Sequence, residues 1–443
     1  MTFSLATSEV NTNPKIWKLK DICSKIGSGA TPRGGESAYL DERVEYAFVR
    51  SQNVFDFKFE SSEVRFISDE SAQKLKGVHL QKDDILLNIT GDGITFSRCC
   101  IVDERILPAA VNQHVAIIRV NQEICLPGYL LAFLCAPETK AYIASFNAGG
   151  SRRAITKGHI ESFEIPAASL KQQEAIQNIV YSIIQKIELN REAHQTLEQM
   201  AQAIFKSWFV DFDPVKAKMN GDQPEGMDAA TASLFPEKLV ESELGLIPEG
   251  WDAGTLSDVA KYCSARTSID SICLDNYIST ENMLADRKGV TTASKLPTAK
   301  MVAAYKTGDV LVSNIRPYFK KIWLAEGNGG RSNDVLGFES SVPNTDAYIM
   351  NLLYQDTFFE YMTRTSKGAK MPRGDKTAIM NWEIAVPPVD LREAYTAIVG
   401  KFYKLIPENR AQNETLESLR DALLPKLLSG EIELGNAEES RDD

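Results

Sequence analysis

Residues 189–209 read LNREAHQTLEQMAQAIFKSWF, and a similar stretch, IPENRAQNETLESLRDALLPKLL, stands at residues 406–428. Both contain Asn-Arg followed by Thr-Leu-Glu at the same internal spacing. In the first stretch and the residues before it, the positions expected to face a partner helix, which we call the seam, recur alternately four and three residues apart. This is the spacing of a heptad repeat. The sequence therefore predicts two similar long helices.

These helices are predicted to pack on each other as an antiparallel pair. A helix of about 39 residues would be roughly 58 Å long, and its stripe of seam residues is too long for its own small domain to bury. An offset of 219 residues maps the first seam onto the second and brings Asn190 onto Asn409. Pro407 is expected to kink or interrupt the second helix. The predicted seam includes Ile183, Ile187, Asn190, Leu197, Ile204, Phe402, Ile406, Asn409, Leu416 and Leu423.

A tandem repeat extends over the rest of the chain. Four further pairs of residues keep the same order in both copies, while their offset falls from 234 to 221. A common framework with loops of different length gives such a drift, because surface loops tolerate insertions and deletions. Chance similarity between two α/β domains is the alternative. The pairs are Trp17 and Trp251, Asp84 and Asp309, Asn112 and Asn333, and Pro166 and Pro387.

Each copy has a β-rich part with Gly-containing turns, followed by its helix. We therefore predict an α+β protein with two α/β domains in tandem repeat, separated by the pair of long antiparallel coiled-coil helices and related by a pseudo-twofold axis. The predicted parts are a flexible N-terminus at 1–14, domain 1 at 15–168, helix 1 at 169–210, a connector at 211–245, domain 2 at 246–389, helix 2 at 390–430 and a flexible tail at 431–443.

Composition narrows the class of protein. The 443 residues are too many for one ordinary core, and 43% apolar with 25% charged residues is usual for a soluble globular protein. The net charge of −11 argues against a general binder of polyanions but leaves local basic patches open. Seven cysteines without a Cys-x-x-Cys motif favour a reducing compartment. With no signal-peptide pattern at its start and no apolar run of membrane-spanning length, the chain is expected in the cytoplasm.

Common catalytic motifs do not occur in the sequence. It has no Gly-x4-Gly-Lys phosphate loop, no His-Glu-x-x-His and no Gly-x-Ser-x-Gly. The four histidines are too far apart along the chain to suggest a zinc site, and His114 is expected to be packed or hydrogen-bonded. The sequence therefore predicts a binding protein without catalytic residues or a metal.

Two basic clusters occupy matched positions in the two copies, because the offset of 221 pairs Arg152 with Arg373. Arginine can bond phosphate or guanine through two parallel hydrogen bonds, so we predict that both clusters contact DNA, mainly at phosphates. A solvated charged loop is the alternative. The clusters consist of Arg152, Arg153 and Lys157 in copy 1, and of Lys367, Lys370, Arg373 and Lys376 in copy 2.

Over nearly its whole length, the chain resembles the specificity subunits of type I restriction–modification systems. The resemblance is carried by Trp17 and Trp251 at the domain starts, by KDDILLNITGDGI, VNQHVAI and ITKGHIESFEIPAASLKQQEAI, and by the two helices with LPKLLSGEI at the close. It implies two target recognition domains, each reading one half of a split, asymmetric double-stranded DNA site. It also implies two helices that space these domains and dock two methyltransferase subunits, with restriction–translocase subunits joining that core.

The same resemblance implies that the chain is not itself an enzyme and binds no cofactor, since S-adenosylmethionine, ATP and Mg²⁺ belong to its partner subunits. The family has no fixed base-reading residues, so these are predicted from side-chain chemistry in the loops. For each candidate an ordinary surface role is the alternative. The candidates are Ser28, Thr31, Arg33, Arg50, Gln52, Asn53 and Thr90 in copy 1, and Asn314, Arg316, Tyr318 and Lys320 in copy 2.

Two other functions stay open at this point. A self-sufficient methyltransferase or nuclease would bind its own cofactor, which the missing motifs disfavour. A coiled-coil scaffold without a nucleic-acid role would show no sequence-selective DNA binding and no effect of replacing Arg152 and Arg373. A DNA affinity that falls with rising salt would favour the DNA-reading function over the scaffold.

Overall fold

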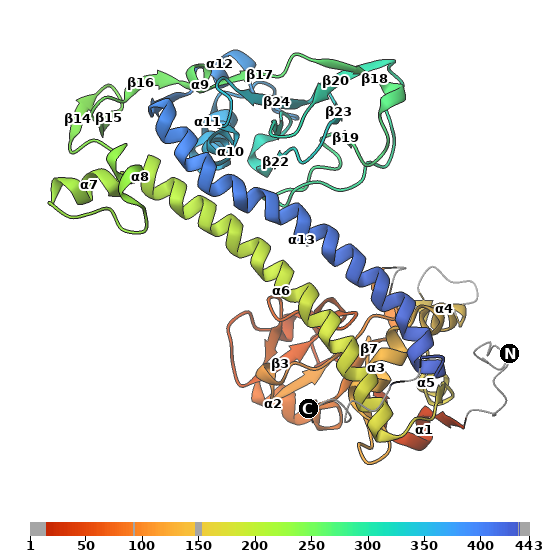
Figure 1. The fold of residues 1–443 in the computed structure, drawn as a ribbon. Helices are drawn as coiled ribbons and strands as arrows, with labels where there is room; N and C mark the ends of the chain where they lie inside the picture. The colour runs from red at the N-terminus through yellow and green to blue at the C-terminus, as the bar shows by residue number, and fades with distance from the viewer. Residues whose placement is uncertain (1–14, 92–93, 147–152, 433, 435–443) are drawn as a thin grey trace, which may run out of the picture. The chain divides into compact units, whose positions relative to one another are not determined.

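The computed structural model describes residues 15–91, 94–146, 153–432 and 434 of the chain (Figure 1). The predicted flexible ends, 1–14 and nearly all of 431–443, lie outside these residues. The chain divides into two compact units, which we call unit 1 (Met1–Leu189 and Gln412–Asp443) and unit 2 (Asn190–Ala411). Each unit therefore contains one β-rich domain together with a part of both long helices.

The long helices are α6, Leu170–Phe209, and α13, Val389–Ser429 (Figure 1). Their ends lie within one residue of the predicted ranges, and at 1.5 Å per residue each is about 60 Å long. Helix α13 continues through Pro407, so the expectation that this proline interrupts the helix is wrong. The proline only removes the N–H that would bond the carbonyl of Tyr403, and Ile406 beside it is buried.

Unit 1 is built on a four-stranded antiparallel sheet in the order β2-β11-β7-β9. Successive residues of β7 point to opposite faces: Ile85 and Leu87 enter the larger core, and Leu86 enters a second one. The sheet is therefore buried on both faces, which explains its continuous apolar sequence. The strands are β2 Cys23–Ser28, β7 Ile85–Asn88, β9 Cys99–Ile101 and β11 Val115–Val120.

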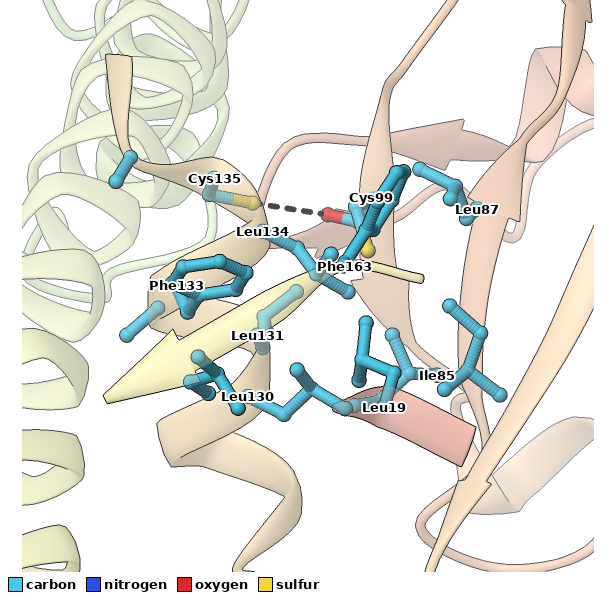
Figure 2. Packing of buried hydrophobic residues seen from close by; sticks show 14 of the residues in the cluster. Leu19, Ile85, Leu87, Cys99, Leu130, Leu131, Phe133, Leu134, Cys135 and Phe163 are labelled. Atoms are coloured by element: carbon cyan, nitrogen blue, oxygen red, sulfur yellow. Dashed lines mark hydrogen bonds between the residues drawn. The ribbon is translucent and has the colours of Figure 1, made fainter. Parts of the chain in front are cut away.

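Helix α3, Pro127–Cys135, covers the larger core of unit 1 and is buried along its whole length. Figure 2 shows its Leu130, Leu131 and Leu134 beside Leu19, Ile85 and Phe163, which come from other parts of the domain. The second core lies under a three-stranded sheet in the order β10-β3-β6, in which β10 and β3 are parallel. These strands are β3 Tyr46–Val49, β6 Arg65–Ile67 and β10 Ala109–Val111.

Unit 2 repeats this plan. Its main sheet has the order β17-β24-β21-β22, again antiparallel, so each strand has its counterpart at the same place in unit 1. Val310 and Val312 of β21 enter one core and Leu311 enters another. This common topology confirms the tandem α+β architecture. The strands are β17 Ala260–Tyr262, β21 Val310–Ser313, β22 Ile322–Leu324 and β24 Val335–Ser340.

The second sheets of the two units both contain a pair of parallel strands, but their other strands are arranged differently. In unit 2 the order is β18-β20-β23-β19, with β19 parallel to β23 as β3 is to β10. The extra strands extend the pair on opposite sides: β6 joins β3 in unit 1, whereas β20 joins β23 in unit 2. These strands are β18 Arg266–Ser268, β19 Tyr277–Ile278, β20 Met301–Tyr305 and β23 Gly329–Arg331.

Both domains are closed by a ribbon that joins their first and last strands, β1 with β13 and β16 with β25. The strands are β1 Ile16–Lys18, β13 Glu164–Pro166, β16 Asp252–Thr255 and β25 Glu383–Val386. The shorter helices are α1 Leu19–Ile22, α2 Asp69–Lys74, α4 Pro137–Ser145 and α5 Lys157–Glu161 in unit 1, and α9 Leu256–Val259, α10 Asp346–Tyr354, α11 Asp356–Arg364 and α12 Lys376–Met380 in unit 2.

The segment predicted as a connector, 211–245, carries regular structure. Val215 and Phe235 within it are buried in the main core of unit 2, so it is a part of that unit rather than a loose link. It contains α7 Asp213–Met219, α8 Ala229–Ser233 and β14 Leu239–Ser242, which pairs with β15 Gly245–Pro248.

Within each unit the parts of the two long helices run antiparallel. In unit 1, Asn413 donates a hydrogen bond to the carbonyl of Ile187 (3.2 Å), while Ile176 shares a core with Leu427. In unit 2, the Tyr395 hydroxyl donates to the carbonyl of Ala201 (2.8 Å). Of the predicted seam residues, Ile187, Asn190 and Ile406 are buried, and Ile183, Leu197, Ile204, Phe402, Asn409, Leu416 and Leu423 are half-buried.

Asp84 and Asp309 hold the same turn before the middle strand of each main sheet. Asp84 accepts the amide of Gln81 (2.7 Å), and Asp309 accepts the amide of Lys306 (2.8 Å). In unit 1 the fully buried Asp84 also accepts two hydrogen bonds from the Arg119 guanidinium, at 2.6 and 2.7 Å. In unit 2, burial raises the pKa of Asp309.

Candidate nucleic-acid interface

Most candidate residues of unit 1 lie at one end of its sheets, which we call edge 1. The register pairs Ala116 with Ser28 and Val115 with Asn88, so Ser28, Thr90 and His114 are neighbours at this end. Hydrogen bonds tie the adjoining loops to the same place: the amide of Ala30 donates to the carbonyl of Val111 (3.0 Å), and the Asn88 amide group donates to the carbonyl of Ser51 (2.9 Å). Edge 1 therefore brings together residues that are far apart in the sequence.

The basic segment of unit 1 is paired with this edge. Strand β12, Arg153–Ala154, runs antiparallel to β8, Thr90–Gly91, in the turn after β7. The Thr90 hydroxyl lies 2.6 Å from Nδ1 of His114, which is hydrogen-bonded as expected. Lys157 is exposed at the start of α5 and pairs with Glu161 at 3.4 Å. Arg152 and the side chain of Arg153 lie outside the described residues.

Asn53 does not fit the predicted role of a base reader. It is fully buried, and its side chain closes the short 3-10 helix η2, Ser51–Asn53, by accepting the amide of Arg50 (2.9 Å) and donating to the carbonyl of Glu60 (3.0 Å). In unit 2, Asn282 accepts the amide of Ser279 (2.7 Å) and donates to the carbonyl of Thr291 (2.7 Å) in the same way. Both asparagines are therefore structural.

Asn282 is not among the residues predicted from the sequence, although the sequence contains a signal for it. Residues 49–54, VRSQNV, align with residues 278–283, ISTENM, and the asparagine occupies the same place in both. The two strands that precede these segments, β3 and β19, hold the same position in the parallel pair of their sheets. The match adds a further pair to the repeat.

Arg50 and Gln52 are both bonded to Glu63. The Arg50 guanidinium donates to the Glu63 carbonyl (3.1 Å), and the Gln52 amide donates to the Glu63 carboxylate (2.8 Å). Because these bonds are on the exposed side of edge 1, a nucleic acid could replace the carboxylate as acceptor. Of the remaining candidates, Ser28 and Arg33 are exposed and Thr31 is half-buried.

Unit 2 has an equivalent end, which we call edge 2. Ile315, just after β21, forms an isolated antiparallel bridge with Arg373, as Thr90 and Gly91 pair with β12 in unit 1. The Arg373 guanidinium lies 3.2 Å from the carboxylate of Asp334, in the turn before β24. The two basic clusters, which the sequence placed at matched positions, thus lie against matched turns of the two sheets.

The lysines of the edge 2 cluster differ in their surroundings. The backbones of Lys367 and Arg373 exchange two hydrogen bonds (2.8 and 2.9 Å), which closes the loop between them. Lys367 is paired with Asp375, and Lys370 and Lys376 are exposed. This loop presents its cations at the surface, where phosphate contacts are made.

Asn314 is the candidate of edge 2 that is placed least well to reach a ligand. It is buried, and Gly374 packs so closely on it that a Cβ there would lie 2.7 Å from Asn314 Oδ1. Its backbone joins the loops of edge 2, with its amide bonded to Asp334 O (2.8 Å) and its carbonyl to the amide of Gly374 (3.2 Å). Asn314 therefore joins the loops of edge 2 from their buried side.

Arg316, Tyr318 and Lys320 belong to a tight turn around the 3-10 helix η6, Pro317–Phe319. Lys320 is held by Asp356 (2.7 Å), which also accepts a hydrogen bond from Arg287 (2.5 Å). These hydrogen bonds from Arg287 and Lys320 lower the pKa of Asp356 to about 2. Tyr318 is exposed at the tip of the turn.

Neither a metal site nor a membrane-spanning helix is found among the described residues. Among them, no three His, Cys, Asp or Glu side chains come together in a way that could hold a metal ion. In the same part of the chain, no helix has the length and apolar character needed to cross a membrane.

Comparisons with known proteins bear on the family and the fold of the chain. Residues 12–199 match the family described as "Type I restriction modification DNA specificity domain". The chain is 25% identical over 438 residues to the type I restriction enzyme HindI specificity subunit of Haemophilus influenzae, covering 87% of this chain and 94% of that protein. It is 23% identical over 456 residues to the MjaIX specificity subunit of Methanocaldococcus jannaschii, covering 96% and 95%.

A solved structure shares the fold. The crystal structure of the type I restriction–modification S subunit from M. genitalium matches with a TM-score of 0.53 and 13% identity, covering 96% of this chain and 98% of that one. The family match thus covers domain 1 and most of helix α6. Over nearly its whole length the chain is a relative of type I restriction enzyme specificity subunits, which confirms the resemblance seen in the sequence.

Proposed function

We propose that this chain is the DNA-reading subunit of a type I restriction–modification complex, in which each unit reads one part of a bipartite DNA site. One observation carries the proposal: both repeats bring a basic segment against the turn that follows the same strand of the same four-stranded sheet. Phosphate contacts position a protein on DNA, and contacts to base edges read the sequence. A DNA-reading domain therefore needs a basic segment beside a group of polar loop residues.

The two edges would read different sequences, because their side chains differ. Edge 1 offers Ser28, Thr31, Arg33, Arg50, Gln52 and Thr90, of which arginine and glutamine suit bidentate contacts to guanine and adenine. Edge 2 offers Arg316, Tyr318 and Lys320. The proposed phosphate contacts are made by the two basic clusters, which are Arg152, Arg153 and Lys157 in unit 1 and Lys367, Lys370, Arg373 and Lys376 in unit 2. The DNA site is therefore asymmetric.

The long helices are the proposed docking surface for two methyltransferase subunits, which restriction subunits then join. Large apolar side chains on both helices are exposed, among them Leu189 and Met200 of α6 and Leu405 and Leu419 of α13. Exposed apolar side chains mark a protein-binding surface where they form a contiguous patch, and we propose that these residues contribute to such a patch. The chain itself would be non-catalytic and act in the cytoplasm, and S-adenosylmethionine, ATP and Mg²⁺ would be bound by its partners.

A domain exchange tests this function. The chain is expressed with its methyltransferase partner and methylated adenines are mapped genome-wide, first with the native chain and then with residues 15–165 taken from a relative. We expect one half of a split motif to change while the other half stays. Exchange of residues 246–389 is the matched control and should change only the other half. A change in the whole motif, or in neither half, would contradict two independent readers.

Replacing Lys370 by alanine should weaken binding to all DNA sequences alike. A lysine that neutralises a phosphate releases about one counterion, so the slope of log affinity against log salt should fall by about 1. Fluorescence anisotropy on target and non-target duplexes at several salt concentrations measures it. Lys261→Ala is the matched control, because Lys261 has the same charge but faces Glu339, away from edge 2. Equal effects of both variants would show that net charge alone is responsible.

A further inference from the structure

The turn after β21 places two aromatic side chains at the surface of edge 2. Tyr318 is 48% exposed and Phe319 is 39% exposed, and their ring centroids lie 4.8 Å apart. Tyr318 also borders an open hollow of about 340 Å³, lined mainly by residues of α11. The Tyr318 ring is therefore only partly packed against its own domain.

The backbone of this turn is held in a strained conformation. Arg316 and Lys320, which flank η6, both have a φ of 50°, in the left-handed region that residues other than glycine rarely adopt. Such a conformation persists only where its surroundings enforce it. Strain of this kind is frequent in ligand-binding turns, where it fixes the direction of a side chain.

Three separate segments enforce the conformation. The amide of Arg316 donates to Pro372 O (2.9 Å), and the amides of Asp286 and Arg287 donate to Phe319 O (2.9 Å) and Lys320 O (3.0 Å). The ion pair of Lys320 with Asp356 adds a side-chain link to α11. The aromatic tip is thus clamped from several sides, so its rings are presented at little cost in conformational entropy.

Unit 1 has an apolar side chain at the equivalent turn. Ile94 lies between β7 and β9, as Tyr318 lies between β21 and β22, and it is 73% exposed. The basic segments adjoin both turns. An exposed apolar residue in this turn therefore recurs in the repeat, aliphatic in one copy and aromatic in the other.

We propose that Tyr318, supported by Phe319, is an aromatic wedge that opens one base step in the half-site read by unit 2 and stacks on an exposed base. The inference rests on the proposed DNA-reading function. Apolar side chains flanked by cations unstack base steps in other DNA-binding proteins, and stacking on an aromatic ring suits any base. The neighbouring loop of lysines and Arg373 favours DNA over a protein as the occupant, because it would hold the phosphates on either side.

The test uses the full chain with its methyltransferase partner and duplexes that carry the mapped target site. 2-Aminopurine is placed at successive positions of the unit 2 half-site, since its fluorescence rises when it is unstacked. We expect a rise at one position with the native chain, and its loss with Tyr318→Ala together with a 5- to 150-fold weaker affinity, about what stacking of one base provides. Tyr318→Phe should keep both the signal and the affinity.

Leu246→Ala is the control variant, because Leu246 is an exposed apolar residue of β15, outside edge 2. The native chain could bind its target site more tightly than other DNA without raising the 2-aminopurine fluorescence at any position. The wedge proposal would then be wrong, while the proposed DNA-reading function would stand. The wedge is equally wrong if Tyr318→Ala lowers only the amount of bound methyltransferase, since the tip would then contact protein. If the native chain shows no preference for the mapped site, the proposed function itself fails.

Discussion

Replacing Tyr395 by alanine is expected to lower the free energy of unfolding of unit 2 by about 3–5 kcal/mol, as the loss of a buried aromatic side chain does elsewhere. Tyr395 is fully buried where α13 meets α6. Its ring centroid lies 5.2 Å from that of Phe209, 5.8 Å from that of Phe205 and 5.9 Å from that of Trp208. The cavity left by alanine would separate the helix pair at its most aromatic point.

Urea unfolding followed by tryptophan fluorescence measures this loss, because Trp208 is next to Tyr395 and three more tryptophans lie in unit 2. Tyr395→Phe is the matched control. It keeps the ring and removes only the hydrogen bond to Ala201 O, so it should cost about 0.5–1.5 kcal/mol. Similar losses for both variants would mean that the hydrogen bond, rather than ring packing, holds the two helices together.

Replacing Arg119 by alanine should destabilise unit 1 by about 3 kcal/mol. The Asp84 carboxylate has no exposed surface and receives two hydrogen bonds from Arg119. Removal of one partner of a buried ion pair leaves an uncompensated charge, which typically costs about 3–5 kcal/mol. We expect the lower end of that range because the Arg119 side chain is itself partly exposed.

Hydrogen exchange with mass spectrometry assigns this loss to unit 1, where peptides from β7 and β11 should exchange faster. Lys306→Ala is the control from unit 2, since Lys306 pairs with Glu339 at the surface and its loss should cost at most about 1 kcal/mol. The double variant Asp84→Asn with Arg119→Met should be more stable than Arg119→Ala. If Arg119→Ala and Lys306→Ala cost the same, burial of Asp84 is not what makes its ion pair important.

The repeat was predictable because its anchors are local. Asp84 and Asp309 each accept a hydrogen bond from a backbone amide three residues earlier. Their pattern in the sequence is therefore kept even where the loops of the two copies differ in length. The heptad spacing predicted the two helices for the same reason. The effect of Pro407 could not be predicted from the local rule for proline, because α13 continues through it with Ile406 buried beside it.

The candidate interface could be predicted only in part. The basic clusters were found from their matched positions, but their place beside Thr90 and Ile315 depends on strand pairing across more than 55 residues. Asn53 has the chemistry of a base reader, and only its burial reveals that it closes a turn. The sequence of 211–245 contains Pro and Gly and shows little periodicity, so the burial of Val215 and Phe235 could not be anticipated.

The division of the chain has a consequence for its synthesis on the ribosome. Unit 2 is continuous in sequence, whereas unit 1 needs Leu424, Leu427 and Leu428 from the end of α13 to complete its core. At about 5–20 residues per second, the segment that ends at Leu189 would wait about 12 to 48 s for the residues up to Leu428 to be made. Although it emerges first, unit 1 finishes folding last, and nascent chains that stop early would expose its apolar interior to chaperones and proteases.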